Sequence, residues 1–111
     1  MMSVVVSLSP AGCIEELRAS GHAGVARHGA DIVCAAVTAV LRTTVEVLHS
    51  RPGVRCQGEA PVEGELTLTV YHIPAESLEW ARGVTDFLLA GCLGIQSEAP
   101  EAVAVEILRR G

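Results

Sequence analysis

The sequence predicts an α+β fold, a two-layer sandwich in which two amphipathic helices cover a small, mainly antiparallel sheet. The helices are indicated by apolar residues that recur every three or four positions over 32–49 and 76–97. The sheet is indicated by apolar and polar residues that alternate over 66–71 and 103–107. At 111 residues the chain has the length of one domain, so residues 1–111 are expected to form a single domain.

The elements are expected in the order strand, strand, helix, strand, strand, helix, strand. Residues 3–8 are rich in valine and precede Ser9-Pro10, which is typical of a strand that ends at a turn. Residues 13–20 are ambiguous, because they have helical propensity but no wide apolar stripe. Residues 54–57 are expected to form a short strand that precedes the alternating segment.

The first helix is expected to follow Asp31, an effective N-cap residue, and to end near His49. Its buried stripe is predicted to contain Val33, Val37, Val40, Thr44 and either Val47 or Leu48. The second helix is predicted to bury Leu78, Ala81, Thr85, Leu88 or Leu89, Cys92 and Ile95. Each helix is therefore expected to pack on the sheet through one side.

Charge and composition argue against direct nucleic-acid binding. The net charge is −5, and the basic residues are eight arginines that cluster only at Arg109-Arg110. The only aromatic residues are Tyr71, Trp80 and Phe87, too few to form the platforms on which single-stranded bases stack. A mildly acidic surface is better suited to a basic protein partner.

The four cysteines, Cys13, Cys34, Cys56 and Cys92, contain no C-x-x-C pair, so their spacing gives little support for a metal site or a disulfide framework. No secretion signal is expected, because the apolar run Val4–Val6 is short and no basic residue precedes it. No segment is expected to reach transmembrane length. The chain is therefore expected to be cytoplasmic, with reduced thiols and without a metal or cofactor.

Residues 20–38 carry the pattern that suggests chemistry. With Asp31 as the N-cap, Cys34 is the third helical residue, where free N–H groups and the helix dipole stabilise a thiolate. His22 lies on the preceding glycine-rich loop and could exchange a proton with Cys34, while N–H groups at the helix start could form an oxyanion hole. Cys34, Thr38 and Leu41 share a helix face offset from the valine stripe, which predicts a thiol at the edge of the core.

Plainer interpretations exist for these residues. Taken alone, a cysteine near a helix start is more often a small buried hydrophobe than a nucleophile. The other histidines are expected to be solvated and the other cysteines to pack in the protein: His28, His49, His72, Cys13, Cys56 and Cys92. A zinc site is a weaker alternative, since it would need four ligands from a segment expected to be mobile: Cys13, His22, His28 and Cys34.

Two separated blocks of this sequence resemble the ribosomal-processing cysteine protease (Prp) family. The family hallmark is G-H-A, a variable glycine-containing loop, and then G-x-D-I-V-C-A-A-V-S. The chain matches it in order and spacing at Gly21, His22, Ala23, Gly29, Asp31, Ile32, Val33, Cys34, Ala35, Ala36 and Val37. Thr38 departs from the pattern, because serine is commoner there, but it keeps the hydroxyl. A weaker resemblance extends along nearly the whole chain.

The resemblance implies that His22 and Cys34 form a catalytic dyad, that Asp31 and Thr38 support activity, and that residues 13–20 form a strand. It also implies a homodimer that removes the N-terminal extension of bacterial large-subunit ribosomal protein twenty-seven, cutting after an aromatic residue. The loop that would close over this basic peptide contains four small residues: Gly21, Ala23, Gly24 and Gly29.

Two other functions remain open. The first is a non-catalytic, ribosome-associated homodimeric binding module that keeps the fold, against which the complete set of His22, Asp31 and Cys34 argues. The second is thiol redox sensing, which would require a resolving cysteine close to Cys34. No membrane partner is expected in any of these cases.

Overall fold

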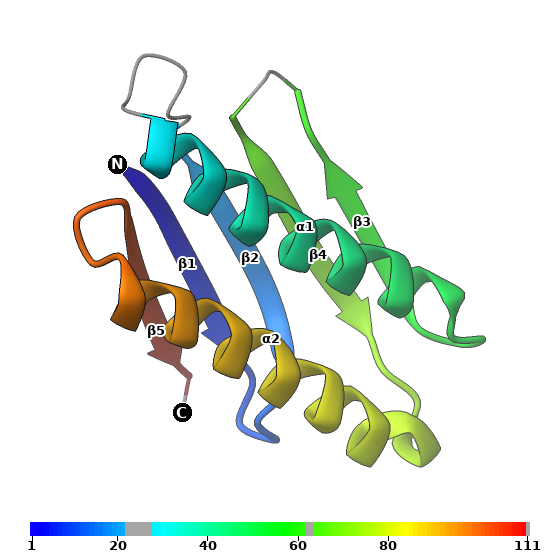
Figure 1. Cartoon of the computed structure of the whole chain (residues 1–111). Helices are drawn as coiled ribbons and strands as arrows, with labels where there is room; N and C mark the ends of the chain where they lie inside the picture. Colours follow the sequence, from blue (N-terminus) through cyan, green and yellow to red (C-terminus); the bar gives the residue numbers. More distant parts are fainter. Residues whose placement is uncertain (22–27, 62–63, 111) are drawn as a thin grey trace.

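The computed structural model describes residues 1–21, 28–61 and 64–110. Its elements follow the predicted order: strands β1 (Met2–Leu8) and β2 (Ile14–Ser20), helix α1 (His28–Ser50), strands β3 (Arg55–Glu59) and β4 (Leu66–His72), a short 3-10 turn η1 (Ala75–Ser77), helix α2 (Leu78–Glu98) and strand β5 (Val103–Arg109). The single sheet has the order β3-β4-β2-β1-β5 (Figure 1). The α+β prediction is confirmed.

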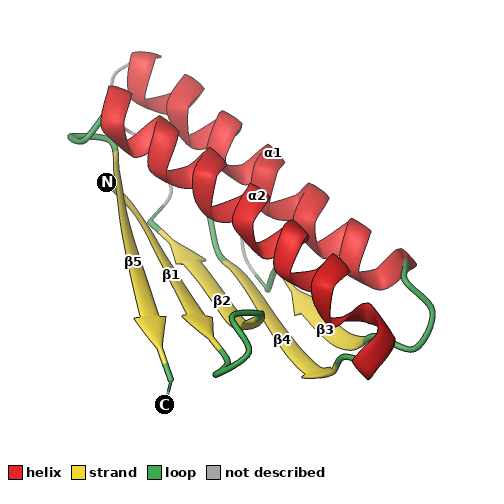
Figure 2. Cartoon of the chain, turned by 90° about the horizontal axis from the view of Figure 1, so that it is seen from below, coloured by secondary structure: helices red, strands yellow, loops and turns green. Residues whose placement is uncertain are grey.

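The two helices lie on the same face of the sheet (Figure 2). Every neighbouring pair of strands is antiparallel except β1 and β5, which are parallel. The parallel pair arises because α2 carries the chain back across the sheet before β5 begins. The prediction of a mainly antiparallel sheet is therefore confirmed, with one parallel edge strand.

Strand β2 explains why the segment 13–20 looks helical in sequence. The register with β1 shifts there, because Leu8 pairs with Ile14 while Ser7 pairs with Glu16, so one residue of β2 is inserted as a β-bulge. The bulge lets Ile14 and Leu17, three positions apart, both face the helices and be fully buried. A spacing of three, normally typical of a helix, here belongs to a bulged strand.

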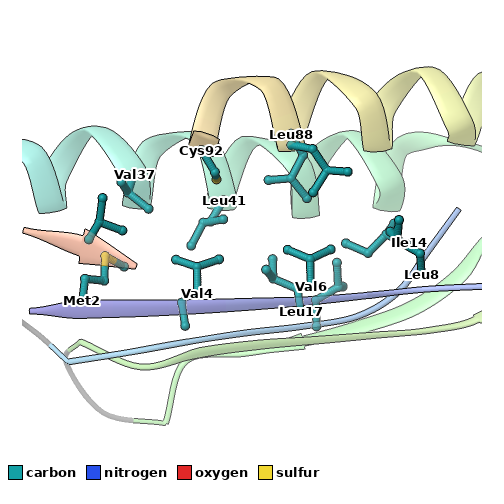
Figure 3. Packing of buried hydrophobic residues seen from close by; sticks show 14 of the residues in the cluster. Met2, Val4, Val6, Leu8, Ile14, Leu17, Val37, Leu41, Leu88 and Cys92 are labelled. Carbon is teal, nitrogen blue, oxygen red and sulfur yellow. The ribbon is translucent and has the colours of Figure 1, made fainter. Parts of the chain in front are cut away.

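The core lies between the sheet and the helices. Val4 and Val6 of β1 and Leu17 of β2 point up from the sheet and meet Leu41 of α1 and Leu88 of α2 (Figure 3). These side chains are fully buried. Burying aliphatic side chains of this size contributes roughly 1.5–3 kcal/mol each relative to exposure, so this layer is the main source of stability.

The buried stripe of α1 differs in part from the predicted one. The residues buried against the sheet and α2 are Cys34, Val37, Leu41, Thr44 and Leu48. Val33, Val40 and Val47 are only partly buried. The predicted stripe chose valines by hydrophobicity, whereas the sheet selects the positions that share one helix face, spaced three and four residues apart.

Helix α1 also begins earlier than expected. It starts at His28, so Asp31 is its fourth residue and not the residue before it, and the N-cap prediction for Asp31 is wrong. Nothing between these two residues stops a helix, because the sequence there has no proline and a single glycine costs only about 1 kcal/mol. Cys34 consequently lies in the second turn of α1.

One helix is long and apolar enough to cross a membrane when only its length and composition are considered, so the prediction that no segment reaches transmembrane length is wrong. The 19 residues Ile32–Ser50 have a mean hydropathy of 1.5, enough to cross a membrane on those criteria. In this fold the segment makes up most of α1, which packs one face on the sheet and α2. Its high hydropathy arises because the opposite face of α1 is also poor in charge.

Candidate active site

The thiol of Cys34 is buried, with only 6% of the residue exposed. It belongs to the same hydrophobic cluster as Val37 and Leu41, so the thiol is more deeply buried than the expected position at the edge of the core implies. As the seventh residue of a helix that begins at His28, Cys34 has a backbone N–H inside the hydrogen-bonded part of α1. The N–H groups that have no partner within this helix are those of its first four residues, His28 to Asp31, which lie one turn before the thiol.

Cys34 nevertheless lies at a defined end of the core. Val37 stands above Met2 and Val4, at the beginning of β1 (Figure 3). Cys34 lies one helical turn before Val37, farther toward that end of the sheet. Strand β2 also finishes there, because Ser20 pairs with Ser3. The structure therefore brings the candidate nucleophile and the exit of β2 to the same end of the molecule.

The chain leaves β2 through Gly21, directly before His22. Gly21 has a φ of 91°, in the left-handed region that favours glycine. His22, Ala23 and Gly24 lie outside the described residues, so the predicted distance between the imidazole and the thiol stays a prediction. Gly29 lies in the first turn of α1. The loop expected over residues 21–31 therefore ends earlier than predicted, at the start of α1.

The proposed supporting residues occupy neighbouring turns of α1. Asp31 lies one turn before Cys34 and Thr38 one turn after it. Thr38 is half-buried and lies on the helix face of Cys34. This arrangement places a hydroxyl within one turn of the thiol, as the sequence pattern predicted.

The other cysteines are in surroundings that disfavour a thiolate. Burial raises the pKa of the Cys92 thiol from its usual value of 9.0 to about 11. Burial also raises the pKa of Cys13, whose thiol donates a hydrogen bond to the Leu78 carbonyl oxygen at 3.6 Å, and the pKa of Cys56 on the edge strand β3. All three thiols are therefore protonated at neutral pH.

The histidines that the structure describes in full, His49 and His72, are exposed, as expected. Among the residues covered by the structure, no group of three histidine, cysteine or acidic side chains is arranged to hold a metal ion. The alternative zinc site includes His22, which lies outside the described residues. Its four ligands therefore remain a sequence hypothesis.

The fold is shared with solved structures. SMU.848 from Streptococcus mutans is 24% identical, with a TM-score of 0.81 over 99% of this chain and 96% of its own. The essential ribosomal processing protease Prp from S. aureus, solved with a substrate peptide, is 20% identical, with a TM-score of 0.81 over 96% of this chain and 99% of its own. The same protease with a covalently linked product peptide is 21% identical, with a TM-score of 0.78 over the same shares of the two chains. No curated protein matches the chain by sequence.

Fold and sequence together define a cysteine-type peptidase built on two helices and a five-stranded sheet. The model of the family described as cysteine protease Prp matches residues 1–104, nearly the whole chain. The chain belongs to this family. The resemblance seen in the blocks around His22 and Cys34 is thus confirmed at the level of the family.

Proposed function

We propose that this chain is a cysteine endopeptidase that removes the N-terminal extension of bacterial large-subunit ribosomal protein twenty-seven and so supports ribosome assembly. The observation that carries the proposal is the family match over residues 1–104, which includes both His22 and Cys34. The similar S. aureus structure supports it, because that protein is a ribosomal processing protease solved with a substrate peptide. The reaction would take place in the cytoplasm, where cysteines stay reduced.

The proposed chemistry needs two residues at the end of the sheet where β2 finishes. His22 takes the thiol proton, and the Cys34 sulfur attacks the carbonyl carbon of the scissile peptide bond. The C–N bond then breaks, the leaving amine takes the proton from the imidazolium, and a thioester remains on Cys34. Water activated by His22 then hydrolyses the thioester, which releases the excised N-terminal extension as a carboxylic acid and returns the proton to the Cys34 sulfur. No cofactor enters either step.

The burial of Cys34 constrains this mechanism. A thiol that is 6% exposed must become accessible to a peptide carbonyl before it can react. The proposed role of Ala23, Gly24 and the rest of the loop is to close over the bound extension and shield the reacting atoms from water. The N–H groups of the first turn of α1, which have no partner within the helix, would then be candidate backbone donors for the oxyanion.

The charge of the chain suits the proposed substrate. With 13 acidic residues against eight arginines, the protein carries a net charge of −5 and attracts a basic ribosomal protein peptide at long range. Raising the salt concentration should therefore raise the KM of the reaction more than it lowers kcat, because screening weakens the encounter and not the chemistry.

A homodimer is the second part of the proposal. The outer faces of α1 and α2 enclose an apolar groove of about 650 Å³, lined by Val40 and Val47 on one helix and Trp80 and Val84 on the other. Phe87 also lines the groove and is 75% exposed. A second copy related by a twofold axis would bury each Phe87 against the groove of its partner, since a twofold contact uses the same patch twice.

The cleavage assay tests the proteolytic part. Ribosomal protein twenty-seven from the same organism, with its extension, is incubated with the protein and its mass is followed. The wild type should release the extension, Cys34→Ala should not, and the half-buried Cys56→Ala should cleave as the wild type does. An intact substrate with the wild type, or cleavage that survives Cys34→Ala, would contradict the proposal.

A non-catalytic, ribosome-associated homodimeric binding module is the alternative, and the burial of Cys34 favours it. The rate of alkylation of Cys34 by iodoacetamide against pH, read by peptide mass mapping, separates the two. If the alkylation rate of the wild type reaches its plateau below pH 7, and that of His22→Ala does not, the result supports a catalytic Cys34. A rate that rises up to pH 9 as in a free cysteine supports the module.

Light scattering during gel filtration tests the dimer. Phe87→Glu should shift the protein to a monomer, because each copy would place a carboxylate in an apolar groove. Tyr71→Glu is the matched control, since Tyr71 is 65% exposed but lies on β4, away from the helices. A dimer that survives Phe87→Glu would exclude this face as the interface.

A further inference from the structure

The exit of β2 is packed against the first peptide unit of the chain. A Cβ atom built on Gly21 would overlap the carbonyl oxygen of Met1, and it would also lie 3.5 Å from the Cα atom of Met2. The nearest obstacle is therefore backbone and not the end of a flexible side chain. Gly21 is consequently limited to glycine by its neighbour as well as by its φ of 91°.

The Met1 carbonyl cannot easily move away from Gly21. Its peptide unit is planar, and the opposite side of that unit is the N–H of Met2, which donates a hydrogen bond to the Ala102 carbonyl oxygen at 2.9 Å. The side chain of Met2 is also buried in the core. The first peptide unit is thus held between β2 on one side and the start of β5 on the other.

We propose that Gly21 is a positioning residue for the reaction, because it alone lets the chain turn against the anchored Met1 carbonyl at the place where His22 leaves β2. The inference rests on the proposed function, since Gly21 acts through the proton exchange between His22 and Cys34. A side chain at position 21 must displace either the first peptide unit or the backbone that carries His22. Because the first peptide unit is tied to Ala102 and to the core, a Cβ at position 21 is expected to shift the backbone of Gly21 itself, directly before His22.

Two substitutions separate the two constraints on Gly21. Asparagine tolerates a positive φ, whereas alanine does not, but both carry a Cβ that overlaps the Met1 carbonyl. In the full chain both Gly21→Asn and Gly21→Ala should lower kcat by about a hundredfold, the loss typical of a reacting group misplaced by about 1 Å. Their KM values should change much less.

Removal of Met1 supplies the rescue. Because residue 2 is also methionine, a chain without Met1 still begins with an initiator methionine. In this shortened chain the carbonyl that opposes the Cβ is gone, so Gly21→Asn should recover at least tenfold in kcat relative to the full-length variant. The kcat of Gly21→Ala should recover less, because removing Met1 does not relieve the unfavourable positive φ of an alanine at position 21.

Gly12 provides the matched control. It also has a positive φ, 81°, but a Cβ there would meet only the Arg82 side chain, at 3.9 Å. It lies in the turn between β1 and β2, at the opposite end of the sheet from Gly21. Gly12→Asn should keep kcat within twofold of the wild type.

The pH profile of Cys34 alkylation distinguishes positioning from loss of stability. If Gly21 positions His22, Gly21→Asn should move the profile toward that of His22→Ala, and removal of Met1 should move it back. An unchanged profile in Gly21→Asn, or a kcat that removal of Met1 does not restore, would overturn the inference while leaving the proposed function intact. If His22→Ala itself leaves the profile of the wild type unchanged, the proposed function fails, and the role of Gly21 fails with it.

Discussion

The hydroxyl of Thr85 holds the β-bulge of β2 to helix α2. Thr85 is fully buried, and its Oγ1 accepts a hydrogen bond from the Ile14 N–H at 3.0 Å while donating one to the Ala81 carbonyl oxygen at 2.8 Å. The Ile14 amide needs this partner because the strand pairing shifts between Ser7 and Leu8. Thr85→Val keeps the shape of the side chain and leaves that amide buried and unpaired.

An unpaired buried N–H costs about 1–3 kcal/mol, so Thr85→Val should lower the free energy of unfolding by that amount. The measurement is urea unfolding followed by circular dichroism, in which the midpoint should fall and the slope should stay constant. Thr85→Ser should cost about 1 kcal/mol, because it keeps the hydroxyl and removes only one methyl group.

Thr44→Val is the matched control. Thr44 is also buried, but its hydroxyl donates to the Val40 carbonyl oxygen of its own helix, at 2.8 Å, and within the described residues it accepts from no backbone amide. Removing the Thr44 hydroxyl should change the free energy of unfolding by less than about 0.5 kcal/mol. Equal effects of Thr44→Val and Thr85→Val would refute the role assigned to the Thr85 hydroxyl.

Three further perturbations test the packing of α1 and α2. Burial raises the pKa of Cys92 to about 11, so this thiol ionises at lower pH in the unfolded chain than in the folded one. The stability that the protonated thiol contributes below pH 9 should therefore be lost as the pH rises toward 11. In urea titrations the free energy of unfolding of Cys92→Ala should fall less over that interval. Leu41→Ala should cost about 2–5 kcal/mol in the same assay, because it opens a cavity in the core, and a cost below 1 kcal/mol would contradict the fully buried position of Leu41. The Arg51 guanidinium lies 4.9 Å from the centre of the Trp80 ring, and its Nε donates a hydrogen bond to Ser77 Oγ at 3.2 Å. Arg51→Met should therefore lower the free energy of unfolding by about 1 kcal/mol and alter the fluorescence of Trp80. Unchanged fluorescence would argue against this stacking in solution.

The sequence predicted the strands and helices that rest on local periodicity. Alternation over β4 and the three- and four-residue spacing over α2 were sufficient, because both reflect one buried face per element. Strand β2 could not be recognised by this rule, since its bulge puts Ile14 and Leu17 on the same face. Only the resemblance to the Prp family indicated a strand there, and the structure confirms it.

The candidate site was predicted as a set of residues but not as a geometry. The motif singled out His22 and Cys34; the match confirms the family, and the roles of the two residues stay a prediction. The same reasoning placed Cys34 in the first turn after an Asp31 cap, whereas α1 starts at His28 and buries the thiol in its second turn. A capping residue favours a helix start without excluding an earlier one, so local sequence could not decide the boundary.

Periodicity and motif spacing are local properties, and for this chain they were enough to predict the class of fold and the family. The order of the elements followed from them only with the family resemblance, which supplied β2. Burial and contact between distant segments are not local. That Cys34 is covered by the core, that Thr85 pairs with the Ile14 amide, and that the Met1 carbonyl stands against Gly21 all depend on segments brought together from distant parts of the sequence. Such contacts arise only when the sheet and helices close around one core, because their energy depends on both partners at once.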